Sequence, residues 1–290
     1  MKAGMAVKRI LLIFAIMIGL YIIFINTPSW LSFGKNGTNA EEINNVELIK
    51  MDISSARSII IPESRDNVEV IVDGRGHASV DKKGDTLEVI YKRNWMDGLS
   101  FFNNSAEVKV FIPENYEEEM QVNVGSGSIK LAGDSEKTPL KLKALDVNMS
   151  SGNVELSNLE VDSFKHEGSS GKLSIDSMTV QSSDINMSSG IGRITNYTGE
   201  LDADISSGKM DIHLKELTGD MNISANSGAI TLDVPNNSDF TLKGKTGSGH
   251  ISSKLALDKQ VESKGELEGS MGTGKHQIKL TVSSGFGEIR

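Results

Sequence analysis

The chain has 290 residues, a net charge of −9 and 38% hydrophobic residues, which fits a globular protein long enough to bury a sizeable core. It contains no Cys, which excludes disulfides, thiolate metal sites, a Cys nucleophile and lipidation through Cys. The acidic balance argues against nucleic acid as a partner, and the 29 Gly with only 5% aromatic residues are typical of a chain with many turns and small core side chains.

The N-terminal segment predicts a single membrane anchor. Residues 10–25 contain no charged side chain, three basic residues precede them, and the first acidic residue is Glu41. Basic flanks stay in the cytoplasm, and roughly 20 apolar residues cross a bilayer. We therefore expect a cytoplasmic tail at residues 1–9 and contact with the cell membrane through residues 10–27. The C-terminal part would lie outside the cytoplasm.

A cleaved signal peptide is the alternative interpretation of this segment. A small-residue cleavage site would then follow the apolar run, but Pro28 and Trp30 suit cleavage poorly. We favour the uncleaved anchor. The Gly- and Asn-containing residues that follow predict a flexible linker at 28–46.

Residues 47–119 predict a β-rich region that has no repeat. Short apolar or alternating runs are separated by turn-forming residues, and no amphipathic helix pattern occurs. The predicted strands are residues 46–53, 58–61, 67–72, 86–91 and 106–112.

One segment of this region breaks the alternation. Residues 94–104 carry Trp95, Phe101 and Phe102 with two further large apolar side chains. Such a loop either covers the open end of a β-stack, which is prone to aggregate, or contacts an envelope partner through aromatic anchors. Trp95, Phe101 and Phe102 are therefore candidate partner-contact residues.

A Ser-Gly turn recurs along the rest of the chain. Most of the intervals are 18 to 25 residues long, and the last, of 36, is nearly two periods. The turn glycines are Gly127, Gly152, Gly171, Gly190, Gly208, Gly228, Gly249 and Gly285.

When the repeats are aligned on this glycine, apolar residues fall seven, five and three positions before it and two and four positions after it. Ile212 is one of these inward positions, and its neighbour Asp211 is expected to point outward. Alternation with a period of two indicates strands with one buried face. Because about 20 residues cannot bury that face alone, stacked coils are expected, which predicts an all-β fold with a β-solenoid at residues 120–290. A meander with a hairpin at each Ser-Gly is the alternative.

Three parts of this sequence together resemble a known protein family. A strand that ends at residues 110–113, the segment 122–129 and the following Ser-Ser-Gly units together resemble the "putative adhesin" family of bacterial β-strand repeats. The resemblance implies a membrane-tethered, extracytoplasmic repeat protein that is associated with cell-envelope stress. The family has no established catalytic residues, so none are implied here.

Signals for chemistry are weak. Residues 269–276 approach a phosphate-binding loop, but His276 stands where Ser or Thr would hold Mg²⁺, and a strand pattern follows instead of a helix. The five His lack metal-ligand spacing, although His166 falls at an inward position. We therefore predict no catalytic, cofactor-binding or metal-binding residues and no cofactor.

The function predicted from sequence is a structural or binding module at the cell envelope. Its partner would be an envelope protein or a cell-wall glycan. The alternative is an envelope polysaccharide lyase or hydrolase, which would need paired carboxylates. Asp184 and Asp202 on neighbouring coils are the closest approach to such a pair.

Overall fold

The computed structural model describes residues 39–93 and 106–290, and every regular element in these two ranges is a β-strand. The strands are β1 (Ala40–Glu42), β2 (Leu48–Glu63), β3 (Asn67–Asp73), β4 (His77–Lys83), β5 (Thr86–Lys92), β6 (Glu107–Pro113), β7 (Glu119–Ala132), β8 (Leu140–Glu216), β9 (Met221–Asp233), β10 (Phe240–Ser253), β11 (Asp258–Ser263), β12 (Glu266–Met271) and β13 (His276–Ile289).

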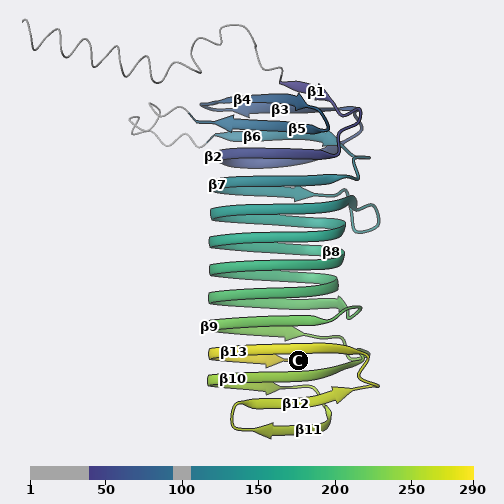
Figure 1. The fold of residues 1–290 in the computed structure, drawn as a ribbon, viewed down its shortest axis with the longest axis vertical. Helices are drawn as coiled ribbons and strands as arrows, with labels where there is room; N and C mark the ends of the chain where they lie inside the picture. Colours follow the sequence, from purple (N-terminus) through teal and green to yellow (C-terminus); the bar gives the residue numbers. More distant parts are fainter. Residues whose placement is uncertain (1–38, 94–105) are drawn as a thin grey trace, which may run out of the picture. The chain divides into compact units, whose positions relative to one another are not determined.

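The repeat forms a stack of parallel coils, as Figure 1 shows for β7, β8 and β9. β7 pairs with the start of β8 so that Gly127 lies beside Gly152, and the end of β8 pairs with β9 so that Gly208 lies beside Gly228. Equivalent residues of successive repeats are therefore neighbours across the stack. This parallel register is that of a solenoid, not of a meander with hairpins at the Ser-Gly turns.

The predicted inward positions form the core. All of them are buried except Gly168, Thr246 and Ser253, which are partly exposed. Ile212 is fully buried, as expected. Asp211 differs from the expectation: it is only 9% exposed, and its carboxylate pairs with Lys209 at 2.8 Å.

Each complete coil of β8 also has a third buried segment, seven and nine residues after the glycine. It contributes residues such as Leu159, Met178 and Tyr197 to the core. The chain enters it through a left-handed residue with φ between 52° and 58°, as at Asn158 and Asn196. Each coil therefore has a second sharp corner that the Ser-Gly alignment does not contain.

The N-terminal β-rich region joins the stack directly. β2 pairs in parallel with β7, and Ala56 occupies the position that glycine holds in later coils. The first half of β2 also pairs with β5, and its second half pairs with β6. Two antiparallel additions, β4 on β5 and β3 with β1 on β6, complete this end.

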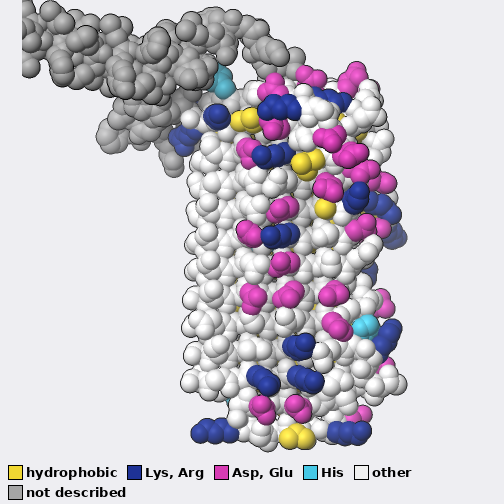
Figure 2. All heavy atoms as spheres, in the orientation of Figure 1, with side chains coloured by type: hydrophobic (Ala, Val, Ile, Leu, Met, Phe, Trp, Pro, Cys, Tyr) yellow, Lys and Arg dark blue, Asp and Glu magenta, His cyan; other side chains and the backbone are white. Residues whose placement is uncertain are grey.

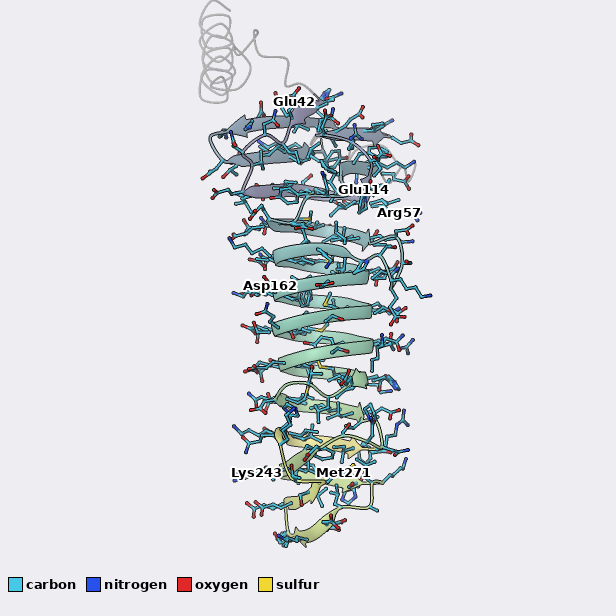
Figure 3. All side chains as sticks on the ribbon, turned by 90° about the vertical axis from the view of Figure 1, so that its right-hand side faces the viewer. Glu42, Arg57, Glu114, Asp162, Lys243 and Met271 are labelled. Atoms are coloured by element: carbon cyan, nitrogen blue, oxygen red, sulfur yellow. The ribbon has the colours of Figure 1, made fainter. Side chains whose placement is uncertain are left out.

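At the other end the coils leave chain order. β13 lies between β9 and β10 and pairs in parallel with both, so that Gly285 stacks between Gly228 and Gly249. The antiparallel strands β12 and then β11 follow β10 (Figure 1). All six residues of β11 are exposed. Figure 3, turned by 90°, shows the labelled Lys243 of β10 toward this end, several coils from Asp162.

No helix within the described ranges is long and apolar enough to cross a membrane. The anchor predicted at residues 10–27 lies outside those ranges.

Candidate functional site: a polar groove along the coils

A groove of about 720 Å³ runs along one face of the stack and crosses six successive coils, from the coil of Asp52 to that of Asp204. With about 4.8 Å between neighbouring coils, its length is about 24 Å. It begins beside the end of β5, where Ile90, Tyr91 and Lys92 line it. A groove of this shape fits an extended ligand that lies across the strands.

The repeat itself builds this groove. One wall is the outward residue four positions before the corner glycine, and the other is the residue two positions before it. The first wall consists of Asp52, Asn123, Asn148, Glu167, Asn186 and Asp204. The second wall is mostly Ser, with Gly at position 125. Buried side chains such as Met149 and Met187 form the floor between the walls.

The first wall contains a hydrogen-bonded ladder of side chains, which ends at a carbonyl oxygen without a hydrogen-bond partner in the described ranges. Asn123 Nδ2 donates to Asp52 Oδ1 at 2.9 Å, and Asn148 Nδ2 donates to Asn123 Oδ1 at 3.1 Å. The next side chain along the wall, Glu167, is itself an acceptor. Asn148 Oδ1 is consequently buried without a hydrogen-bond partner among the described residues. A buried polar atom without a partner is unfavourable, and Asn153 Oδ1, which lies outside the groove, is in the same state.

The carboxylates of the wall differ in their surroundings. Burial, and then repulsion from Asp202 and Asp184, raise the pKa of Asp204. Glu167 is instead paired with Lys165 at 2.8 Å, and this cation lowers the pKa of Glu167. Negative charge in the groove is therefore least compensated at its Asp204 end.

The corner beside the groove presents hydroxyl groups. The residue before each corner glycine is Ser in every coil, and Ser126 Oγ donates to Ser55 Oγ of the coil above at 3.2 Å. The face and its uncharged corner are visible in Figure 2. A row of identical hydroxyls at the coil spacing is expected for a repeated corner. These hydroxyls show no sign of an activated nucleophile, since among the described hydrogen bonds no base contacts any one of these Ser residues.

Two other predicted features have structural roles. His166 is 2% exposed, and its Nδ1 lies 2.9 Å from Val147 O. In the segment that approaches a phosphate-binding loop, Asp239 Oδ1 accepts hydrogen bonds from the backbone N–H groups of Gly274 at 2.6 Å and Lys275 at 2.9 Å. The carboxylate thus occupies the amides that a phosphate would need, and β13 follows in place of a helix.

The groove was not predicted from the sequence, in which only Asp184 and Asp202 were considered as a possible pair of carboxylates. No group of His, Asp or Glu in residues 39–93 and 106–290 could hold a metal ion. Trp95, Phe101 and Phe102, the predicted partner-contact residues, lie outside the described ranges. The signal that could have revealed the groove is the run of Asn, Asp and Glu at one repeat position next to small Ser and Gly two positions later.

The fold and the groove define a parallel β-solenoid with a polar face. The chain belongs to the Toastrack DUF4097 family, whose model matches residues 46–289. No curated protein matches the sequence significantly.

Several solved structures are similar to the chain. A "putative lipid binding protein" from Parabacteroides distasonis is 16% identical with a TM-score of 0.46, covering 89% of this chain and 98% of that one. A "putative adhesin" from Bacteroides fragilis is 11% identical with a TM-score of 0.39, covering 87% and 95% of the two chains.

Proposed function

We propose that this protein is a membrane-tethered, extracytoplasmic binding module that holds a linear cell-wall glycan in the groove. The row of polar side chains along the groove carries the proposal, because sugar hydroxyls donate to and accept from such groups and the groove continues past Asn148 in both directions. The backbone groups of the coils are used in the ladder between strands. A ligand must therefore be recognised by side chains, and Asn, Asp, Glu and Ser are those that the walls supply.

The location belongs to the same proposal. The uncharged residues 10–25 behind a basic N-terminus support an anchor with the coils outside the cytoplasm. The whole chain also resembles LiaG of Bacillus-type bacteria, which supports a link to cell-envelope stress. We propose that the protein acts by binding and not by catalysis. Protease added to intact protoplasts should then digest the part beyond residue 40, and protection of that part would contradict the proposed topology.

The glycan proposal is tested by replacing Asn148 with Ala in the full chain. Soluble cell-wall glycan fragments should bind the unaltered protein, and Asn148→Ala should weaken binding about tenfold, because a net hydrogen bond to a buried group contributes roughly 1–1.5 kcal/mol. Isothermal titration calorimetry measures the change. Asn153→Ala is the matched control, since Asn153 lies across the corner, outside the groove, and donates to Glu155 at 2.7 Å. Equal losses in the two variants, or no binding by the unaltered protein, would refute the glycan proposal.

A further inference from the structure

A column of charged side chains runs down the face beside the groove. It is formed by the residue six positions before the corner glycine and by its neighbour on β12. Registers place its members in the order Lys165, Asp184, Asp202, Asn222, Lys279, Lys243 and Glu268. All seven residues are exposed. Figure 2 shows this face, with acidic side chains across the middle coils, Lys below them, and acidic side chains again at the lower end.

The order of charges in this column reverses sign about its centre. Asn222 is neutral, Asp202 and Lys279 lie one coil to either side of it, and Asp184 and Lys243 lie two coils away. Three coils away the signs are exchanged, since Lys165 is basic and Glu268 is acidic. Each of the six charged residues is therefore matched by an opposite charge at the same distance on the other side of Asn222.

Within one copy, like charges are neighbours among the inner residues of the column. Asp184 neighbours Asp202 and Lys279 neighbours Lys243 at the coil spacing, and like charges at this distance destabilise a sheet. Across the described part of the chain, none of these four side chains forms an ion pair, although Asp184 accepts a hydrogen bond from Asn186 at 2.7 Å and Asp202 accepts from Asn222 at 3.2 Å. The raised pKa of the adjoining Asp204, caused by burial and by Asp202 and Asp184, reflects the concentrated negative charge.

We propose that this face binds the same face of a second copy in an antiparallel arrangement, with the two-fold axis along the strands at Asn222. The rotation keeps each position along the strand and reverses the order of the coils. Asp202 then faces Lys279 of the second copy, Asp184 faces Lys243, and Lys165 faces Glu268. Each of these contacts occurs twice, as an isologous interface requires.

The size of the face is adequate for such a dimer. Seven coils at about 4.8 Å and six strand residues at about 3.3 Å give about 29 Å by 17 Å, or roughly 500 Å² per copy. The total of about 1,000 Å² is at the lower limit for specific association. Asp220, which would meet Asp220 of the second copy, accepts from Gln277 N at 2.8 Å within its own copy. Glu167 would meet Glu266, which pairs with Lys245 at 3.7 Å, while Glu167 shares Lys165 with Glu268 of the second copy.

The dimer leaves part of the groove open. The overlapping coils run from that of Lys165 to β12, so the coils that carry Asp52, Asn123 and Asn148 lie beyond the overlap. Association would cover the groove at the coils of Glu167, Asn186 and Asp204 and leave the part up to Asn148 open, and the dimer does not depend on the glycan proposal.

Cross-linking tests the arrangement in the full chain, which has no Cys of its own. Two Asn222→Cys copies should be joined by a short bis-maleimide that bridges the ~10 Å between packed sheets. Gln121→Cys is the control, because Gln121 stands in the same column but two coils beyond the overlap. We expect several-fold more cross-linked dimer from Asn222→Cys, decreasing at high salt because exposed ion pairs are screened. Equal yields would overturn the proposal.

A charge exchange tests the pairing. In the Asn222→Cys background, Asp202→Lys and Lys279→Asp should each lower the dimer yield several-fold, since each places like charges opposite one another. The double variant should restore the yield, because it exchanges the charges and keeps the net charge. Unchanged yields in both single variants, or a double variant that stays as low as the singles with an unchanged melting temperature, would overturn the proposal.

Discussion

At the corner glycines of the repeat there is no room for a single additional atom, the Cβ of any other residue. Gly190 has φ 125°, and a Cβ added there would lie 1.9 Å from Gly171 O of the neighbouring coil. Both the left-handed backbone and the close stacking of coils therefore require glycine at this corner.

We predict that Gly190→Ala destabilises the protein by at least about 2–3 kcal/mol, because backbone strain of about 1–3 kcal/mol adds to the clash. Thermal unfolding of the full chain measures the effect. Gly84→Ala is the control: Gly84 also has positive φ, at 67°, but a Cβ there meets nothing within 4 Å. If Gly84→Ala proved as damaging as Gly190→Ala, coil contact would not be the cause.

His166 predicts a pH dependence of stability. Burial is the main factor that lowers the pKa of this imidazole in the folded protein. The unfolded chain then takes up a proton that the folded chain resists, so the contribution of His166 to stability is present above about pH 6.5, the pKa of the unfolded chain, and is lost as the pH falls below it through the lower pKa of the folded protein. Urea unfolding at several pH values should show a weaker decline for His166→Leu. His77→Leu, at an exposed site, should keep the slope of the unaltered protein.

At the scale of elements, each coil depends on the side-chain direction of its short strands. Ile194 is fully buried, whereas the adjacent Arg193 is exposed. We predict that Ile194→Asp unfolds several neighbouring coils, because an unpaired charge cannot be buried cheaply and each coil covers the next. Arg193→Asp should change stability by less than about 0.5 kcal/mol. Hydrogen exchange distinguishes the two variants, and similar protection in both would contradict the inward assignment.

The strand alternation was predictable because neighbouring residues in the sequence alternate between apolar and polar. The inward columns and the parallel stack followed from it. The third buried segment was not predicted, because its two apolar positions are too few to reveal a period and its corner residue varies between Asn158, Ser177 and Asn196. The coil of β2 escaped a search for Ser-Gly because Ala56 replaces the glycine.

The groove was only partly predictable for a related reason. Its polar wall was visible as outward Asn, Asp and Glu, but depth arises from the small residues at the corner and from where β5 ends. Whether Asn148 Oδ1 has a hydrogen-bond partner depends on the direction of two amide groups in adjacent coils. Such a contact joins residues 25 positions apart and leaves no local pattern.

At the scale of the whole molecule, the C-terminal strand completes the stack. Removing residues 276–290 takes away Ile278, Leu280 and Val282, all fully buried between β9 and β10. We predict that the shortened chain loses amide protection in β10 and β12 and keeps it in the central coils of β8, since each coil contacts only its neighbours. Hydrogen exchange measures this, and protection of β10 equal to that in the full chain would contradict it.

The position of β13 between β9 and β10 also determines the order in which the coils can fold during synthesis. A chain emerges from the ribosome or an export channel amino end first, so the coils up to Gly228 can form as their residues arrive. The strand β10 comes next, but its place is against β13, whose residues appear only after those of β11 and β12. Until then Phe240 and Leu242, buried in the finished protein, lack their cover. This end of the stack is therefore completed only when β13 has appeared, and proteases or chaperones that act on unfinished chains can bind the uncovered β10 before that.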